Sequence, residues 1–262
     1  MNGEALFFDT HAHLDCPPLV QRLAGELAAA RAAGVGRFLV PGVAPQGWQR
    51  LLETVDSVPD AWAAPGIHPL AAQDWNSSTV AALAALLDHP RVVAVGEIGL
   101  DALLDGPSPA IQEVALRGQL RLAREAGLPV LIHCRRAQGR LLDILREERA
   151  GERGGILHAF SGSIETARQA MDLGFAIGFG GTLTYPNARR APEVLKALPA
   201  AWVVLETDAP DIAPHPHRGE DNRPAWLALI AAEVARIRNW SLEETARITT
   251  ENACRVLKIT PP

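Results

Sequence analysis

The sequence predicts an α/β fold: a single-domain TIM barrel of eight parallel strands, each followed by a helix. Short runs rich in β-branched and aromatic residues alternate with Ala-, Leu- and Arg-rich segments of helical period. Eight strand candidates give about 33 residues per strand–helix unit, an alternation typical of a parallel sheet. Ionisable residues gather where those strands end, and TIM barrels carry out their chemistry at that rim.

The elements follow one another without a linker. The strand candidates are Leu6–Asp9, Arg37–Val40, Ala61–Ala64, Val92–Gly96, Pro129–Ile132, Gly155–Leu157, Phe175–Gly178 and Trp202–Leu205. The helices expected between them include Leu19–Ala33, Val80–Leu87, Ile111–Ala126, Arg140–Ala150 and Ile164–Leu173. Glycines that could end such helices are Gly34, Gly127, Gly151 and Gly174. A Pro-rich loop, Ala209–Pro224, precedes a last helical region, Trp226–Leu257. An open doubly wound sheet is the alternative, but no Gly-x-Gly-x-x-Gly follows the first strand.

Composition bounds the function classes. With 48% hydrophobic and 21% charged residues, the 262 residues are expected to form one globular domain, residues 1–262. A net charge of -5 argues against broad adhesion to nucleic acid or an anionic membrane. This charge does not exclude a nucleic-acid enzyme that binds its substrate locally through a metal. Three widely spaced cysteines, and no signal-peptide or membrane-spanning pattern, predict a cytoplasmic protein without an obligate protein partner.

The first strand ends in a His-x-His pair. His11 and His13 stand at i and i+2, so on an extended backbone their imidazoles project to the same side. Two adjacent imidazoles form half of a metal site.

Later strand ends supply the remaining donors. Glu97, His133, His158 and Asp208 each follow a strand candidate. Four imidazoles and two carboxylates at one rim would be costly to bury without a cation, so the set predicts metal binding. The predicted ligands are His11, His13, Glu97, His133, His158 and Asp208.

Six ligands exceed the needs of one tetrahedral metal. Catalytic zinc usually takes three protein ligands and a water, so the count favours two divalent ions bridged by a carboxylate, for which Glu97 is suited. Asp208 can ligate and also act as general base. Imidazoles favour Zn, Mn or Fe, and carboxylates also admit Mg; one or two divalent ions, Zn, Mn or Mg, are expected.

The other histidines have simpler interpretations. His68 could orient substrate or merely close a turn with Pro69. His89 precedes Pro90 at a helix end and is expected to be structural. His215 and His217 lie in the Pro-rich loop with no strand before them, which disfavours a metal role.

The ordered motifs give the chain a family resemblance. They are Asp9-Thr10-His11-Ala12-His13, Gly66-Ile67-His68-Pro69, Gly96-Glu97-Ile98-Gly99-Leu100-Asp101, Pro129-Val130-Leu131-Ile132-His133, His158-Ala159-Phe160-Ser161-Gly162 and Leu205-Glu206-Thr207-Asp208-Ala209-Pro210. In this order the chain resembles the TatD family of metal-dependent hydrolases in the amidohydrolase-like superfamily. The resemblance implies a divalent-metal-dependent deoxyribonuclease, often a 3′-to-5′ exonuclease, with the six ligands above. It also implies that His68 and Glu206 line the site.

The departures from that family concern the substrate. Ala102 and Leu103 occupy positions where family members commonly carry tyrosines, and aromatic rings stack on single-stranded bases. Asp221 stands where a basic residue is usual and Arg223 where Glu is usual. The loss of a cation at position 221 should weaken phosphate binding. Arg135, Arg218 and Arg223 could compensate for that loss.

Three functions therefore compete. The first is cleavage of single-stranded DNA or another phosphoester. The second is hydrolysis of an ester or amide, such as an aminoacyl-tRNA or a small cyclic amide, because this superfamily hosts both chemistries. The third is a closed metal-holding scaffold, which the open, hydrolytic ligand types disfavour.

Overall fold

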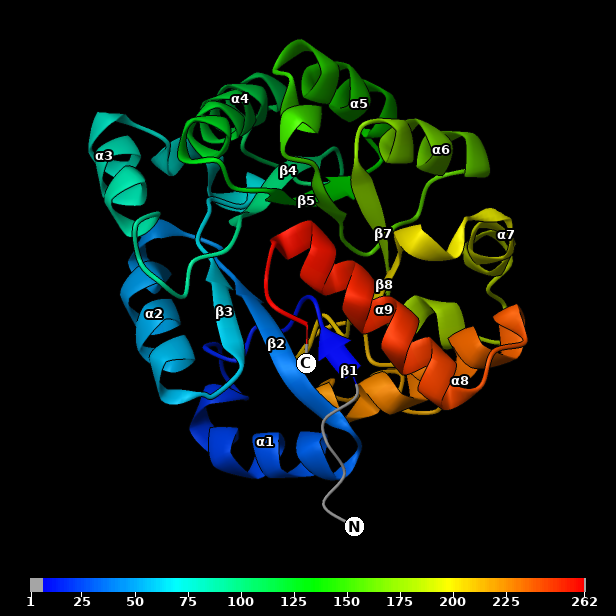
Figure 1. Cartoon of the computed structure of the whole chain (residues 1–262). Helices are drawn as coiled ribbons and strands as arrows, with labels where there is room; N and C mark the ends of the chain where they lie inside the picture. Colours follow the sequence, from blue (N-terminus) through cyan, green and yellow to red (C-terminus); the bar gives the residue numbers. More distant parts are fainter. Residues whose placement is uncertain (1–6, 262) are drawn as a thin grey trace.

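The computed structural model describes residues 7–261, and all eight expected strands form there (Figure 1). Leu6, the expected start of the first strand, lies outside the described residues. The strands are β1 (Phe7–Asp9), β2 (Val35–Pro41), β3 (Ala61–Ala64), β4 (Val95–Asp101), β5 (Val130–Arg135), β6 (Gly155–Leu157), β7 (Phe175–Phe179) and β8 (Val203–Leu205). Every pairing between successive strands is parallel, so the α/β TIM-barrel prediction is confirmed.

The strands pair in two groups, β1-β2-β3 and β4 to β8. Two parallel bridges close the ring between these groups: Ala63 pairs with Val92, and Ala12 pairs with Ala209. The second bridge lies just beyond the ends of β1 and β8. It therefore joins the His-x-His segment to the segment that carries Asp208.

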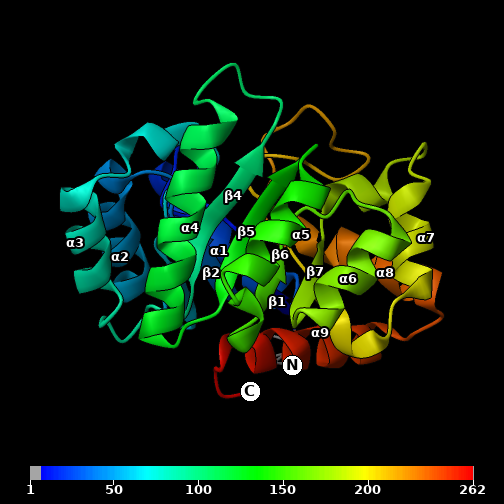
Figure 2. The same cartoon turned by 90° about the horizontal axis from the view of Figure 1, so that it is seen from above.

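Helices surround the strands in chain order (Figure 1). They are α1 (Leu23–Ala32), α2 (Trp48–Ser57), α3 (Ser77–Leu86), α4 (Pro109–Ala126), α5 (Gln138–Glu147), α6 (Ile164–Asp172), α7 (Arg190–Ala197), α8 (Leu227–Arg238) and α9 (Leu242–Leu257). Figure 2 shows α9 across one end of the barrel, whereas the loops after β4 and β8 rise at the opposite end. Among residues 7–261, no helix combines the length and apolar character that crossing a bilayer requires.

Two apolar clusters hold these layers together. The larger one includes Phe38, Ile132 and Ile177 on the strands and Leu120 and Ile230 on the helices. The smaller one fills the barrel with side chains such as Phe8, Leu39 and Leu131, and Cys254 and Leu257 of α9 pack against them. Because α9 and this packing close one end, the opposite rim is the open end for chemistry.

Several expected boundaries were wrong. β4 runs to Asp101 rather than stopping at Gly96, because its backbone stays paired with β5 as far as Arg135. Gly127 ends α4 with φ 75°, as expected, but Gly151 lies inside a short 3-10 turn after α5. The last helical region divides into α8 and α9 at Asn239, which adopts φ 55°.

Helix α4 anchors the loop after β3 through Gln119. This fully buried amide accepts from the backbone N–H of Ile67 at 2.7 Å and donates to the carbonyl of Ile67 at 3.1 Å. Gln119 therefore fixes the residue that precedes His68.

We expect Gln119→Leu to lower the free energy of unfolding by about 2–4 kcal/mol, because two buried backbone groups lose their partner at about 1–3 kcal/mol each. Urea denaturation measures the change. Gln49→Leu is the matched control, because Gln49 is exposed on α2 and its side-chain amide donates to the exposed carboxylate of Glu53. The control should change stability by less than about 0.5 kcal/mol. Equal changes in the free energy of unfolding for the two substitutions would contradict the anchoring role of Gln119.

Candidate metal centre

The segments after β1 and β8 are locked together by their backbones. Thr10 N–H donates to the carbonyl of Leu205, and Asp208 N–H donates to the carbonyl of His11. Asp9 strengthens this junction, because its buried carboxylate accepts from the N–H and hydroxyl of Thr207 at 2.9 and 2.6 Å and from the N–H of His11 at 3.3 Å. Burial raises the pKa of Asp9 to about 7, against the lowering effect of these bonds. The geometry fixes His11 relative to Asp208.

Four donor atoms converge at this junction. The Nε2 atoms of His11 and His13 lie 3.3 Å apart. His11 Nε2 is 3.3 Å from Glu97 Oε2 and 3.4 Å from Asp208 Oδ1. His13 Nε2 is 3.7 Å from the same Asp208 oxygen. Donors about 2.1 Å from a tetrahedral zinc ion lie about 3.4 Å from one another, so these four atoms have the spacing of a metal's coordination shell.

A second group of donors surrounds the other oxygen of Glu97. Glu97 Oε1 lies 2.7 Å from Nδ1 of His133, 3.2 Å from Nε2 of His158 and 3.8 Å from Nε2 of His68. Glu97 itself is 3% exposed, and its backbone N–H donates to the carbonyl of Gly42. One carboxylate therefore faces two sets of nitrogen donors, one through each oxygen.

A close approach of β4 to β5 places Glu97 between these sets. A Cβ on the preceding Gly96 would lie 2.6 Å from Cβ of Leu131, so only glycine permits that spacing. His133 then comes from β5, and His158 follows β6 directly. The rings of His11 and His158 stack with their centroids 3.7 Å apart, which connects the two donor sets.

Burial keeps the imidazoles of His11 and His13 neutral. It lowers the pKa of His13 and takes that of His11 well below its usual value. Burial likewise lowers the pKa of His68 to about 4. A neutral imidazole retains the lone pair that a metal requires, so His11 and His13 are in a ligating state near neutral pH. Nδ1 of His68, by contrast, already accepts the N–H of Leu70 at 3.1 Å.

The carboxylates and His158 form a strongly coupled group. Burial disfavours charge on Glu97, but the imidazole of His158 is the chief group that outweighs it, and the pKa of Glu97 is held well below its usual value. Burial also disfavours charge on His158, yet its neighbouring carboxylates raise the pKa of His158 well above normal. The buried anions thus demand a positive charge, and a divalent cation supplies one in the same place.

Glu206 lies behind His158. Its fully buried carboxylate accepts from the N–H of Ala159, and Oε1 is 3.3 Å from Nδ1 of His158. Gly178 leaves the space for it, because a Cβ there would lie 2.4 Å from Glu206 Oε2. Sequence reasoning had placed Glu206 beside the site through the family resemblance, and the structure places it there.

Asp101 is part of this cluster but was absent from the predicted site residues. Its Oδ2 lies 3.2 Å from Nε2 of His133, and the residue is 3% exposed. Asp101 is the last residue of β4. An ionisable residue at a strand end was the available signal, the same signal that selected Glu97.

The two predicted substrate arginines lie outside the donor cluster. Arg135 ends β5, with its Nη1 3.9 Å from Asp101 Oδ2 and its side chain 59% exposed. Arg218 lies in the loop after β8, where its guanidinium stands 4.9 Å above the ring of Tyr185. Arg223 is already engaged, because its Nε donates to the buried carboxylate of Glu26 at 2.9 Å.

The remaining histidines stay apart from the two donor sets. His89 pairs with Asp56 at 3.5 Å. His217 stacks on Trp226 with a centroid separation of 4.0 Å and contacts Glu220 at 3.1 Å. His215 is exposed, and its backbone N–H donates to Thr184.

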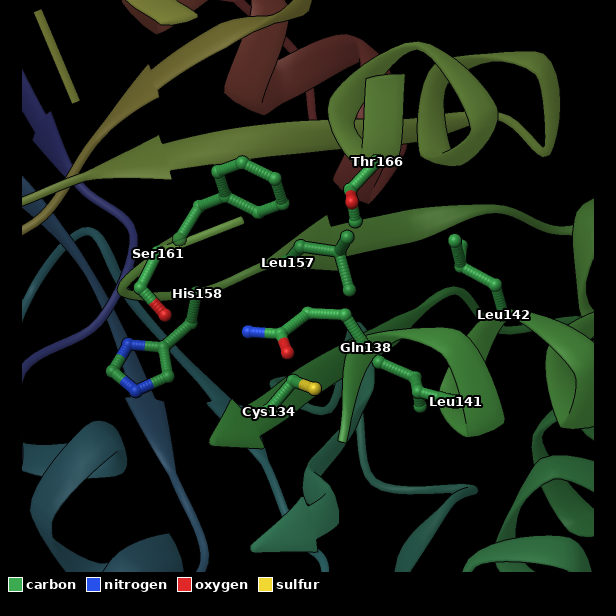
Figure 3. A pocket seen from close by; sticks show the side chains of 9 residues that line it. Cys134, Gln138, Leu141, Leu142, Leu157, His158, Ser161 and Thr166 are labelled. Carbon is green, nitrogen blue, oxygen red and sulfur yellow. The ribbon is translucent and has the colours of Figure 1, made fainter. Parts of the chain in front are cut away.

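A small cavity lies beside His158, between β5 and β6 and the helices α5 and α6. It measures about 10 Å³, and Figure 3 shows the imidazole at its edge, away from Leu141 and Leu142. Cys134 and Gln138 also line it. A cavity of this volume holds about one water molecule, so a substrate must reach the donors from the open rim instead.

Comparison with known proteins gives a consistent result. The profile of the family described as TatD related DNase matches residues 8–258. The uncharacterized metal-dependent hydrolase YabD of Bacillus subtilis is 39% identical over 254 residues, which cover 97% of this chain and 100% of YabD. The 3'-5' ssDNA/RNA exonuclease TatD of Cronobacter sakazakii is 37% identical over 241 residues, which cover 88% of this chain and 89% of that enzyme.

Solved structures agree with the sequence relatives. The crystal structure of YjjV, a TatD homolog from Escherichia coli K12, matches with a TM-score of 0.93 and 35% identity, covering 98% of this chain and 99% of YjjV. The phosphotriesterase homology protein of Escherichia coli matches with a TM-score of 0.71 at 14% identity, covering 97% of this chain and 99% of that one. The second likeness shows a shared barrel fold.

Proposed function

The chain belongs to the family of TatD-related DNases, and from that premise we propose that it is a metal-dependent hydrolase that cleaves phosphodiester bonds as a 3′-to-5′ exonuclease. One observation above all supports this proposal: the two oxygens of Glu97 face separate sets of donors, His11 and His13 on one side and His133 and His158 on the other. Such a carboxylate is suited to bridge two divalent ions. The ssDNA/RNA exonuclease named above supplies the substrate class.

In this proposal six residues hold one or two ions of Zn, Mn or Mg. They are His11, His13, Glu97, His133, His158 and Asp208. The bound ions would polarise the phosphoryl oxygen and make water a stronger nucleophile at neutral pH. The first donor set combines two imidazoles with two carboxylates at separations close to those in a tetrahedral shell, which favours zinc or manganese over magnesium there.

In this proposal, side chains of the protein accept the proton of the attacking water and bind the substrate. Asp208 accepts the proton of the attacking water, because its carboxylate reaches the first donor set and its burial raises its pKa well above the usual value. Arg135 and Arg218, both exposed, bind flanking phosphates. His68 and Glu206 line the site, as the family resemblance implies. We also infer that residues 1–262 form one hydrolase domain.

A second candidate function is hydrolysis of a carboxyl ester or amide. Ala102 and Leu103 favour it, because both are exposed just after β4 and offer no ring for a base to stack on. The sequence contains no Phe, Trp or Tyr from residue 98 to residue 159. The same donors would attack a carbonyl carbon.

One substrate panel separates the two functions. Purified protein loaded with Zn²⁺, Mn²⁺ or Mg²⁺ is given single-stranded DNA labelled at its 5′ end, an aryl phosphodiester, a carboxyl ester and an aminoacyl-tRNA. We expect progressive 3′ shortening of the DNA, loss of this activity in His133→Ala, and retention in His215→Ala. Turnover of the carboxyl ester or the aminoacyl-tRNA without DNA shortening would select the second function. A metal-loaded protein inactive on every substrate would refute both.

A further inference from the structure

His133 stands between two buried carboxylates and contacts one through each ring nitrogen. Its Nδ1 lies 2.7 Å from Glu97 Oε1, and its Nε2 lies 3.2 Å from Asp101 Oδ2. His133 is 9% exposed, and both carboxylates are 3% exposed. The surroundings of the ring therefore decide which nitrogen carries the proton.

Asp101 is held rigidly from three directions. Its second oxygen, Oδ1, accepts the N–H of Leu103 at 2.8 Å. Its backbone N–H donates to Oε1 of Gln112 at 2.8 Å, and its carbonyl accepts from Nε2 of Gln112 at 3.1 Å. Gln112 lies on α4 seven residues before Gln119, on the same face, and is also buried. Only Oδ2 of Asp101 is left to face His133.

We propose that Asp101 is a positioning residue that holds His133 as the Nε2–H tautomer and so turns the Nδ1 lone pair toward the metal, with Gln112 fixing Asp101 in place. The inference rests on the proposed metal-dependent function. A carboxylate cannot donate a hydrogen bond, and Nδ1 would have to supply a lone pair once a cation occupied the Glu97 side of the ring, so Nε2, which faces Asp101, would then carry the hydrogen. Histidine ligands commonly donate their second N–H to a carboxylate, which fixes the ring orientation and strengthens the ligand.

His158 supplies an internal comparison. Its Nε2 faces Glu97 Oε1 at 3.2 Å, and its Nδ1 faces Glu206 Oε1 at 3.3 Å. The two rings thus present opposite nitrogens to the same oxygen of Glu97. Asp101 and Glu206 are the outer carboxylates that select these opposite orientations.

Asp101→Asn separates positioning from a structural role in the turn. The amide oxygen keeps the bond from the N–H of Leu103, so the turn is preserved. The amide nitrogen then faces Nε2 of His133 and donates to it, which moves the ring proton to Nδ1. A protonated Nδ1 has no lone pair for a metal.

We expect Asp101→Asn to bind Zn²⁺ about 10–100-fold more weakly than wild type, measured by competition with a chromophoric chelator. With Zn²⁺ present, ¹⁵N imidazole spectra should show His133 as the Nε2–H form in wild type and show loss of that form in Asp101→Asn at the same Zn²⁺ concentration, with the signal assigned by its loss in His133→Gln. Asp105→Asn removes a carboxylate from the same loop at an exposed position, and it should bind Zn²⁺ as wild type does.

Unchanged Zn²⁺ affinity, or an unchanged tautomer, in Asp101→Asn would overturn the proposal. If Asp101→Asn does not fold, Gln112→Leu decides in its place: at least threefold weaker Zn²⁺ binding supports the proposal, and wild-type binding overturns it. A wild-type protein that binds no Zn²⁺, Mn²⁺ or Mg²⁺ would refute the proposed function itself, a result distinct from a failure of the Asp101 variant alone.

Discussion

Glu97→Gln should reduce kcat for phosphodiester cleavage by about 10³-fold, because about 4 kcal/mol of transition-state stabilisation is lost when the shared carboxylate disappears. The substitution replaces one carboxylate oxygen by an NH₂ group, which donates and cannot ligate a metal. Whichever side the NH₂ faces, it meets imidazole nitrogens, since His11 lies 3.3 Å from Oε2 and His133 lies 2.7 Å from Oε1. Elemental analysis should show that bound metal per chain falls by at least half.

Glu165→Gln is the matched control for this experiment. Glu165 is exposed in the first turn of α6, so removing its charge should leave both kcat and metal content at wild-type levels. Retention of more than about a tenth of wild-type kcat by Glu97→Gln would contradict the bridging role. Circular dichroism of the two variants distinguishes a loss of chemistry from a loss of fold.

The barrel could be predicted because each strand carries a local apolar pattern, whereas the helices after β2 and β7 were expected without an assigned residue range. α2 carries Trp48, Leu51 and Val55 on one buried face, a helical spacing that was present but short. α7 contains Pro192 in its first turn, which resembles a helix breaker although proline is tolerated there. Both are short helices whose stability comes from packing on the barrel.

The ends of β4 and β5 could not be predicted from their own residues. Beyond Gly96 the chain reads Glu97-Ile98-Gly99-Leu100-Asp101, and its glycine and two acidic residues are of types depleted in strands. The extension forms because β4 stays in register with β5, with Ile98 opposite Ile132 and Gly99 opposite His133. Pairing between segments more than thirty residues apart leaves no local pattern.

The six predicted ligands converge because TIM barrels bring all their strand ends to one rim. The sequence did not predict which nitrogen of each imidazole faces Glu97. That His133 faces Glu97 through Nδ1 while His158 does so through Nε2 depends on distances between strands. The roles of Asp9 and Asp101 were missed for the same reason, since each acts on a residue brought near by the fold.

Loading the centre with metal should stabilise the whole barrel. Donors from five separate strand ends meet here, and the cluster contains fully buried His11 and nearly buried Glu97. A ligand that binds only the folded state at about a thousand times its Kd adds roughly 4 kcal/mol to the free energy of unfolding. For a chain of this size, that corresponds to a rise in Tm of about 10 °C. Differential scanning calorimetry with and without Zn²⁺ or Mn²⁺, after chelator treatment, measures it.

The same measurement on two histidine variants tests whether the effect arises at this centre. His11→Ala removes a nitrogen that lies within 3.4 Å of His13, Glu97 and Asp208, so it should abolish most of the metal-induced rise in Tm. His215→Ala should keep the full rise, because His215 is exposed in the loop after β8 and contacts neither donor set. If both variants respond to metal as wild type does, the stabilising ion binds elsewhere. If only His11→Ala fails to respond, the His-x-His segment is part of the site that stabilises the barrel.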